Sequence, residues 1–417
     1  MRILFLSNVY PPYSQGGYEQ LCQEVAQLLA ARGHTLCVLA GRTTGAADVE
    51  EDGPVRVHRR LELELEGGLS HTIARLAIGG REASERRNVA TVERLIDEFQ
   101  PDAVLIWGMW NVPRSVPAAV ERLLPERVAY YLCDYWPVLP NAYIQRLEAP
   151  ARRGHADWAK RGITQLLLPA AAAEMPTSLS FKRAACVSYA LRDALVHQGT
   201  PLDNAQIIHN GIYLSDFSVG SDAPSTNNSL RLIYSGRLSP EKGLHVALEA
   251  LALLDGSVAN RCELLIAGGG DEDYLRHLRT IATRGSVPVT FLGHVGRANI
   301  PRLLSESQVL IFPSEWGEPL ARAVIEAMAA GLAVIGTTTG GTGEILVEGK
   351  TGLTFRPGDP ADLARQITWL AADPRLREQL AAAGQALVLR EFDIRSTVDQ
   401  LESLLCQATI QSESPVA

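Results

Sequence analysis

The chain has 417 residues, of which 46% are hydrophobic and 21% are charged, and its formal net charge at pH 7 is −8. This composition is typical of a globular protein with two or three domains, and it excludes a disordered chain, a collagen-like repeat and a coiled-coil rod. The acidic balance argues against a general nucleic-acid binder, because phosphate backbones require a basic face. Local basic pockets for small phosphates are still compatible with it.

Cysteine usage and the lengths of the apolar runs bear on the cellular compartment. The six cysteines form no C-x-x-C pair and no metal-ligand spacing, so we expect free thiols in a reducing compartment. The apolar stretch near the N-terminus is too short for a secretory signal, and no run approaches the ~20 residues that span a bilayer. We therefore expect a cytosolic protein, with peripheral attachment to a membrane surface as the other option.

Strand-like apolar runs alternate with amphipathic helical stretches along the first half of the chain. Ile3–Leu6 is expected to form the first strand, residues 18–34 a helix that stops near Gly33, and Thr35–Ala40 the next strand. An outer strand is expected over Val55–Glu66, whose residues alternate in part. Further strands are expected at Asp102–Trp107, Val128–Cys133, Ala184–Ser188 and Ala205–Gly211. Continuous apolar strands between helices predict a parallel sheet covered on both faces.

A break in composition at Ser218–Ser229 separates this series from a second α/β series. The segment is rich in Gly, Ser, Asn and Pro, which is typical of a linker. Strands are expected beyond it at Leu230–Gly236, Cys262–Gly269, Val289–Val295, Gln308–Ser314 and Leu332–Thr337. The sequence thus predicts an N-terminal domain over 1–217, a linker over 218–229, a C-terminal domain over 230–388, and a helix and tail over 389–417. Doubly wound sheets of this kind bind ligands at the carboxyl ends of their strands.

Two glutamates in the second series have a spacing that suits a nucleotide sugar. Glu318 precedes Pro319, and proline is favoured as the first helical residue, so Glu318 is expected to cap a helix. Glu326 would then lie two turns along that helix, about 12 Å away. This separation resembles the span from a sugar to a ribose across a diphosphate, and a helix N-terminus favours the anion between them. The alternative is an ordinary capping glutamate and an ordinary mid-helix glutamate.

A loop with two cations follows the first strand of the second series. Arg237 and Lys242 on this loop are suited to neutralise a diphosphate, the arginine through paired donors and the lysine as a point charge. Two solvated surface cations are the alternative. The glycine loop Gly340–Gly341, Gly293 after a strand, the cation loop and the paired glutamates together favour a diphosphate site.

These motifs, in their order, resemble those of the family-four glycosyltransferases with the GT-B architecture, over nearly the whole chain. The resemblance rests on PPYSQGGYE, HNGI, SGRLSPEKG, GEPLARAVIEAMAAG and the GG-x-x-E loop Gly340–Glu344. It implies an enzyme that transfers a hexose from a nucleotide-diphosphate donor, expected to be a UDP-sugar, with retention of anomeric configuration and without a metal or other cofactor. It also implies two Rossmann-like domains that face a cleft, with a C-terminal helix that crosses back to the N-terminal domain.

The resemblance also implies roles for individual residues. Arg237 and Lys242 match the cations of the donor diphosphate, Glu326 matches the carboxylate on the ribose, and Glu318 matches the one near the transferred sugar. The expected catalytic residues are Glu318, Arg237, Lys242 and Asp134. Further donor contacts are expected from loop residues of both domains: Gly16, Gly17, Gly293, His294, Val295, Pro319, Leu320 and Ala321. Fixed positive groups aimed at the leaving diphosphate would stabilise the charge that develops on it.

The acceptor side is less well defined by the sequence. The family commonly has a His-Asp pair at one strand end, whereas this chain has Cys133 before Asp134, and a cysteine does not reproduce the hydrogen bond of an imidazole. The expected acceptor contacts are Gly17, Asp134, Arg152, Arg153 and Lys160. The basic run among them would hold an acceptor phosphate, although a solvated helix face is the commoner meaning of such a run.

Several functional alternatives stay open at this point. The acceptor is a hydroxyl of a sugar, a sugar phosphate or a glycan-lipid, with fructose 6-phosphate, as in sucrose-phosphate synthase, as one alternative. A non-catalytic relative that binds nucleotide sugars is the other. The D-x-D pattern Asp271–Asp273 suggests a metal site, but acids in the first turn of a helix explain it better. No G-x-G-x-x-G follows the first strand, which disfavours a nicotinamide dehydrogenase, and the histidines have no metal-ligand spacing.

Overall fold

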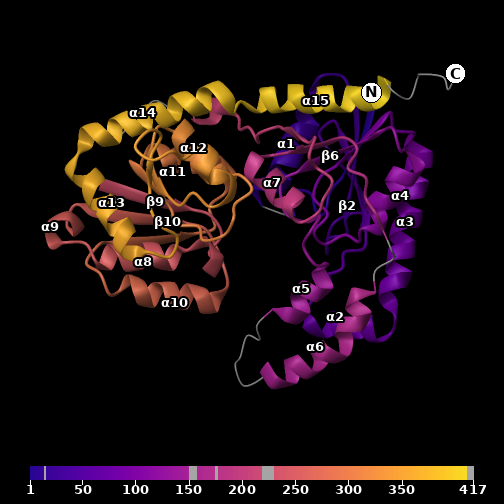
Figure 1. Ribbon diagram of the computed structural model, residues 1–417, viewed down its shortest axis with the longest axis horizontal. Coiled ribbons are helices and arrows are strands. Elements are labelled where there is room, and N and C mark those ends of the chain that lie inside the picture. Colours follow the sequence, from indigo (N-terminus) through magenta and orange to yellow (C-terminus); the bar gives the residue numbers. More distant parts are fainter. Residues whose placement is uncertain (14–15, 150–156, 174–176, 218–229, 411–417) are drawn as a thin grey trace. The chain divides into compact units, whose positions relative to one another are not determined.

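The computed structural model describes residues 1–13, 16–149, 157–173, 177–217 and 230–410. The chain divides into two compact units, one made of Met1–Ile208 with Val398–Ala417 and the other of His209–Thr397 (Figure 1). The expected linker at 218–229 lies outside the described residues, and the other expected domain limits stay a prediction. Each unit is an α/β domain with its own sheet, so the predicted fold class is confirmed.

The N-terminal unit has an eight-stranded sheet in the order β3-β4-β2-β1-β5-β6-β7-β8. Neighbouring strands are parallel except β3 and β4. The strands are β1 (Arg2–Leu6), β2 (Thr35–Gly41), β3 (Val49–Asp52), β4 (Val55–Leu61), β5 (Ala103–Ile106), β6 (Val128–Leu132), β7 (Ala184–Cys186) and β8 (Gln206–Ile207). The helices are α1 (Gly17–Ala31), α2 (Leu69–Ala77), α3 (Gly80–Phe99), α4 (Ser115–Leu123), α5 (Ala142–Glu148), α6 (Asp157–Ala172) and α7 (Tyr189–His197).

The apolar runs of the sequence form the buried centre of this sheet. Every residue of β5 and β6 is buried, and so are the last four residues of β1, because helices cover both faces of the sheet. Strand β1 pairs with β2 on one side and with β5 on the other. The chain therefore reverses its direction of winding between β1 and β5, and the carboxyl ends of these strands flank the switch point where such sheets bind ligands.

The predicted outer strand was wrong in its extent and its place. Strand β4 ends at Leu61 rather than at Glu66, and it pairs with β2 as the second strand from the edge. The edge is formed by Val49–Asp52, which runs antiparallel to β4. This edge strand has only four residues, alternately exposed and half-buried, so its apolar signal is too weak to stand out in the sequence.

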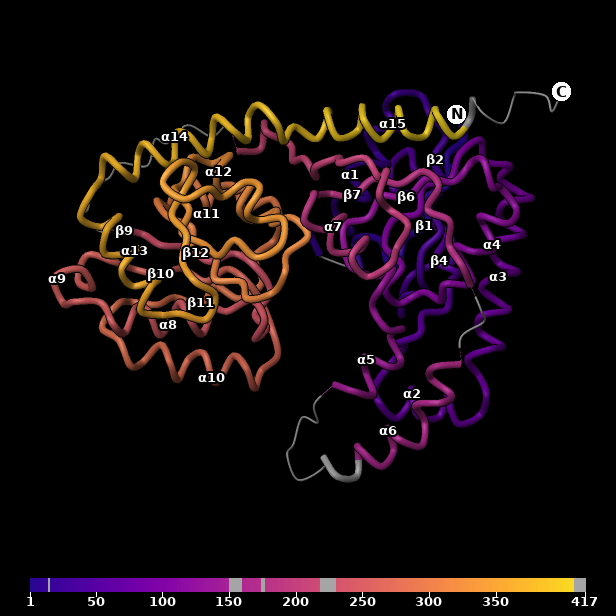
Figure 2. Tube along the Cα trace, in the orientation of Figure 1, coloured from indigo at the N-terminus to yellow at the C-terminus, as the bar shows by residue number. Residues whose placement is uncertain are grey.

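Three helices of the N-terminal unit, α2, α5 and α6, form a separate group beyond the end of the sheet (Figure 2). They share a small apolar core of their own, made of Leu76, Tyr143, Leu147, Leu167 and Ala171. This group of helices was not predicted from the sequence.

The C-terminal unit has a six-stranded parallel sheet in the order β11-β10-β9-β12-β13-β14. The strands are β9 (Leu230–Ser235), β10 (Cys262–Ala267), β11 (Val289–Gly293), β12 (Val309–Phe312), β13 (Ala333–Gly336) and β14 (Leu353–Thr354). The helices are α8 (Leu244–Ala252), α9 (Gly256–Ala259), α10 (Glu272–Ala282), α11 (Ile300–Ser305), α12 (Arg322–Ala329), α13 (Pro360–Ala372) and α14 (Pro374–Glu391). Helices α8, α10 and α13 pack along one face, and α12 packs on α14 along the other (Figure 1).

The last helix, α15 (Ile394–Ile410), begins in the C-terminal unit and continues into the N-terminal one. Arg32 at the end of α1 pairs with Asp399 at 2.6 Å and with Glu402 at 2.5 Å, and His34 also contacts Glu402. The prediction of a C-terminal helix that returns to the N-terminal domain is confirmed. Helix α14 continues to Glu391, and Phe392 and Asp393 interrupt the helical path before α15 begins, so residue 389 lies within α14.

Candidate functional site

The predicted cation loop and the predicted glutamate loop of the C-terminal unit are in direct contact. The Lys242 Nζ atom lies 2.5 Å from Oε1 of Glu318, and the Ser314 hydroxyl donates to the same oxygen over 2.7 Å. Backbone bonds join the two loops as well, because the amides of Glu315 and Trp316 both donate to the carbonyl oxygen of Glu241. Lys242 and Glu318 are therefore fixed as a pair after β9 and β12.

Two glycines with positive φ allow these loops to approach so closely. Gly243, with φ +67°, follows Lys242, and a Cβ atom there would lie 1.9 Å from the carbonyl oxygen of Pro313. Gly340, with φ +61°, would place a Cβ atom 2.2 Å from the carbonyl oxygen of Glu318. The next amide, of Gly341, donates to that same oxygen over 2.7 Å. Only glycine fits both the backbone conformation and the contact at these positions.

The expected helix cap at Glu318 was wrong. Helix α12 begins at Arg322 with Ala321 as its N-cap, and Glu318, Pro319 and Leu320 belong to the preceding loop. Glu318 and Glu326 therefore do not lie on one helix, and the expected 12 Å along a helix axis does not describe their separation. The backbone contacts of Glu318 with the glycine loop explain the difference, because they hold this segment out of the helix.

Glu326 is held by two arginines that were not predicted as site residues from the sequence. Its Oε1 atom lies 2.5 Å from Nη1 of Arg297 and 2.9 Å from Nε of Arg322, one turn earlier on α12. Glu326 is buried, whereas the Arg297 side chain is one-third exposed and lies over the ring of Phe217. Arg322 could have been found from its i, i+4 spacing to Glu326. Arg297 is 29 residues away in sequence, and no local pattern connects it to Glu326.

The other predicted donor residues of the C-terminal unit follow β9, β11 and β12 in the chain. Arg237 is exposed, and its backbone carbonyl accepts a hydrogen bond from the Tyr234 hydroxyl. Gly293 ends β11 with φ +70° and open space around the position of a Cβ atom, followed by exposed His294 and half-buried Val295. Leu320 and Ala321, just before α12, are buried. Their roles in donor binding stay predictions.

Three of the predicted residues of the N-terminal unit, Gly16, Gly17 and Asp134, follow strands β1 and β6 in the chain. Gly16 is the N-cap of α1 and Gly17 its first residue, and neither has a positive φ. The next residue, Tyr18, packs against Trp107, and a side chain at Gly108 after β5 would strike the tyrosine ring. The α1 N-terminus is thus fixed beside the switch point between β1 and β5.

Asp134 follows β6 in the same unit, and the pKa of its carboxyl group is raised. Its carboxylate accepts the Trp136 amide over 2.9 Å. The residue retains some accessible surface, but its carboxyl group is packed deeply among neighbouring atoms, and this burial raises the pKa of Asp134 to about 7. The nearby Glu19 acts in the same direction, while the Trp136 amide opposes it. Asp134 can therefore exchange a proton near neutral pH, as a group with general acid-base character does.

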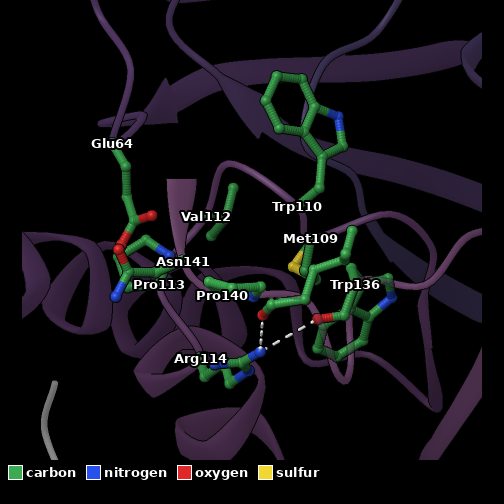
Figure 3. Close-up of a pocket in the computed structure, with 10 residues that line it drawn as sticks. Glu64, Met109, Trp110, Val112, Pro113, Arg114, Trp136, Pro140 and Asn141 are labelled. Atoms are coloured by element: carbon green, nitrogen blue, oxygen red, sulfur yellow. Dashed lines mark hydrogen bonds between the residues drawn. The ribbon is translucent and has the colours of Figure 1, made fainter. Parts of the chain in front are cut away.

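A small pocket lies beside the segment that follows Asp134. Arg114 at the start of α4 donates to the carbonyl oxygens of Trp136 and Leu139, which fixes the segment (Figure 3). Trp110 and Trp136 both line this pocket. Of these two tryptophans, Trp136 is buried and serves packing, whereas Trp110 is partly exposed and presents its ring to solvent.

The predicted basic acceptor cluster is only partly visible. Arg152 and Arg153 lie outside the described residues. Lys160, on α6, donates to the carbonyl oxygen of Ala149, and Arg161 beside it is exposed. Their role in acceptor binding stays a prediction.

The suspected metal motif is explained by helix capping. Asp271 is the N-cap of α10, and its side chain accepts the Asp273 amide over 3.0 Å. Among the described residues, no group of three or more His, Cys, Asp and Glu side chains is placed to hold a metal ion. The six cysteines are free thiols, as predicted. Within the described ranges no helix has both the length and the apolar character that crossing a bilayer requires.

Two family models between them match most of the sequence. Residues 15–216 match the model described as Glycosyltransferase Family 4, and residues 222–387 match that of Glycosyl transferases group 1. Glycogen synthase of Mycobacterium tuberculosis (strain H37Rv) is 26% identical over 407 residues, which are 94% of this chain and 91% of that protein. Spore coat protein SA of Bacillus subtilis (strain 168) is 36% identical over 179 residues, which are 42% of this chain and 48% of that protein.

Solved structures share the architecture at low sequence identity. Sucrose-phosphate synthase from Thermosynechococcus elongatus has a TM-score of 0.74 at 19% identity, and the alignment covers 99% of this chain and 100% of that one. HepE of Anabaena, solved in complex with UDP-glucose, has a TM-score of 0.64 at 21% identity, with coverage of 97% and 99%. At this level of identity the solved structures identify the fold.

Proposed function

We infer the reaction from the premise that this chain belongs to the family-four glycosyltransferases with the GT-B fold and is an enzyme that transfers sugars. Its donor is a nucleotide sugar. We propose that the donor is a UDP-sugar and that transfer to a hydroxyl of a sugar-containing acceptor retains the anomeric configuration. The UDP assignment is supported by the structural likeness to HepE, which was solved with UDP and UDP-glucose.

The observation that carries the proposal is the Lys242–Glu318 pair held against the glycine loop. The 2.5 Å contact places a fixed cation and a carboxylate side by side where two strands of one sheet end. A cation there neutralises the diphosphate, while the carboxylate accepts hydroxyls of the attached sugar. Exposed Arg237, on the same loop as Lys242, supplies a second cation. Glu326, fixed by Arg297 and Arg322, then binds the ribose hydroxyls.

The main role of these residues in the reaction is to stabilise charge. In the reaction the bond from the anomeric carbon to the diphosphate oxygen breaks, a bond from that carbon to the acceptor oxygen forms, and the proton of the acceptor hydroxyl passes to the leaving diphosphate. Negative charge grows on the diphosphate as it leaves, so preorganised cations lower the barrier without a metal ion. On this proposal Arg237 and Lys242 contact the reacting diphosphate, and no cofactor takes part.

A donor screen tests the proposal. UDP-, ADP- and GDP-glucose are first compared by thermal shift, because a ligand that binds the native state raises its melting temperature. Release of nucleoside diphosphate is then measured with maltotriose, glucose, glucose 6-phosphate and fructose 6-phosphate as acceptors, and NMR of the product identifies the anomer. We expect UDP release that depends on an acceptor, and an anomer with the donor's configuration.

Different results would contradict different parts of the proposal. Preference for ADP- or GDP-glucose would refute the UDP assignment alone, and an inverted product would refute retention. Loss of activity in Arg237→Gln and Lys242→Gln, with folding intact, is expected from their role on the diphosphate. Full activity in both variants would contradict it.

A further inference from the structure

A hollow of about 500 Å³ opens in the N-terminal unit, outside every residue assigned so far. It lies where β1, β2 and β4 end, because its lining includes Val9, Thr43, Thr44 and Leu63 from the loops that follow these strands. Its volume is within the range of pockets that hold small ligands. Carboxyl ends of parallel strands are also where doubly wound sheets bind their ligands.

Tyr13 lines this hollow and is held there by a buried arginine. The ring of Tyr13 lies 4.6 Å from the guanidinium carbon of Arg59, which is 1% exposed, whereas Tyr13 itself is 44% exposed. Arg59 donates to the carbonyl oxygens of Tyr10 and Pro11 and pairs with Glu50. One buried cation thus fixes the backbone before Tyr13 and supports its ring, so an exposed aromatic ring keeps a defined orientation.

The charges around the hollow suit an uncharged, hydroxyl-rich ligand better than a phosphate. Its charged lining residues are Arg42 and Arg59 with Asp48 and Glu66, two of each sign. Three donor nitrogens of Arg59 already bond to Glu50 and two carbonyl groups, and Arg42 faces Glu62 at 3.9 Å. A dianionic phosphate would find little uncompensated positive charge there. Carboxylates, guanidinium groups and threonine hydroxyls are instead the donors and acceptors that sugar hydroxyls use.

We propose that this hollow binds an uncharged saccharide as the acceptor, with one sugar ring stacked on Tyr13 and its hydroxyls bound by Thr43, Thr44 and Asp48. The proposal rests on the proposed transferase function, and it differs from the sequence-based expectation that Arg152, Arg153 and Lys160 hold an acceptor phosphate. An aromatic face packs against the apolar face of a sugar ring, while the rim of the site binds its hydroxyls.

The test compares Michaelis constants for acceptor and donor. With UDP-glucose as donor, maltotriose and fructose 6-phosphate are compared as acceptors for wild type, Tyr13→Ala, Tyr13→Phe and Thr44→Val. We expect maltotriose to be preferred, and Tyr13→Ala to raise its KM by about tenfold, the effect of losing one moderate interaction. Tyr13→Phe keeps the ring, so it should restore the wild-type KM. The KM for UDP-glucose should not change in any variant.

A matched control separates the hollow from a general effect of losing a tyrosine. Tyr189 of the same unit is 53% exposed and lies under Arg192, outside the hollow, so Tyr189→Ala should leave both Michaelis constants unchanged. An unchanged maltotriose KM in Tyr13→Ala, or activity with fructose 6-phosphate only, would overturn the inference while leaving transferase activity in place. Wild-type protein without any transfer would overturn the proposed function, and with it this inference.

Discussion

Glu326 illustrates how single residues in this chain are set by partners far away in the sequence. Arg297 and Arg322 both contact its Oε1 atom, so the carboxylate is held in one orientation. The family resemblance implied Glu326 as the ribose ligand, whereas the predicted separation of about 12 Å from Glu318 assumed one continuous helix. Arg297 contacts Glu326 from outside α12. No local sequence pattern predicts this contact.

Replacing Glu326 by Gln should weaken UDP binding. The amide loses the charge that strengthens its hydrogen bonds to ribose hydroxyls, and the loss of one such bond corresponds to roughly ten- to hundredfold in affinity. Titration calorimetry with UDP measures the change, and Glu306→Gln at the C-cap of α11, where the carboxylate pairs with Arg302, is the control. Equal UDP affinities in wild type and Glu326→Gln would remove Glu326 from the ribose site.

Asp134 should make stability depend on pH. Because burial raises its folded pKa from 3.8 to about 7, the folded state binds a proton that the unfolded state has lost between these values. Stability from this group is therefore present below pH 4 and decreases as the pH rises to 7. Asp134→Asn keeps the acceptor for the Trp136 amide without the charge. Its melting temperature should exceed that of wild type at pH 8 and equal it at pH 4; a constant difference across this range would contradict the raised pKa.

At the scale of elements, the fully buried strands were predictable, whereas the edge strand β3 and the loop-to-helix junctions were not. Runs such as Ile3–Leu6 and Val309–Phe312 are buried on both faces, so their apolar character alone marks them. The start of α12 depends instead on contacts with a distant loop: Gly340 and Gly341 hold the Glu318 backbone, and the helix begins three residues later than Pro319 suggests. The same contact brings Lys242 and Glu318 together. The residues of the candidate site could therefore be predicted from the sequence, whereas their geometry could not.

The glycine loop offers a direct test of this contact. Gly340 and Gly349 have similar positive φ, +61° and +66°, but only at Gly340 would a Cβ atom meet backbone, whereas Gly349 has open space around it. Gly349→Ala should lower the free energy of unfolding by about 1–2 kcal/mol, because alanine disfavours the left-handed conformation. Gly340→Ala should cost more and also weaken UDP binding, because the Glu318 loop must shift. Urea denaturation and calorimetry measure both; equal effects of the two variants would show that the contact does not matter.

At the scale of the whole molecule, the N-terminal unit depends on a helix from the far end of the chain. Val398, Leu401, Leu404 and Leu405 of α15 are buried and belong to that unit. The sequence predicted this return from the family resemblance. An amphipathic pattern alone does not state which unit a helix packs on.

Truncating a buried side chain of α15 should therefore destabilise the N-terminal unit. Leu401→Ala is expected to lower its free energy of unfolding by about 2–5 kcal/mol, as other large-to-small core changes do. Hydrogen exchange should accelerate in β1 and β5 and stay unchanged in β12. Leu389→Ala on α14, where the side chain is half exposed, is the control. Acceleration confined to β12 would contradict the assignment of α15 to the N-terminal unit.

The path of α15 also orders events during synthesis on the ribosome. The C-terminal unit is one continuous stretch, His209–Thr397, so all of its residues are available once Thr397 has emerged. The N-terminal unit is translated first, yet it lacks part of its core until α15 has been made. Domains usually fold in the order of their translation. In this chain the N-terminal unit is translated first but completed last. Its core stays incomplete until the whole C-terminal unit has been synthesised.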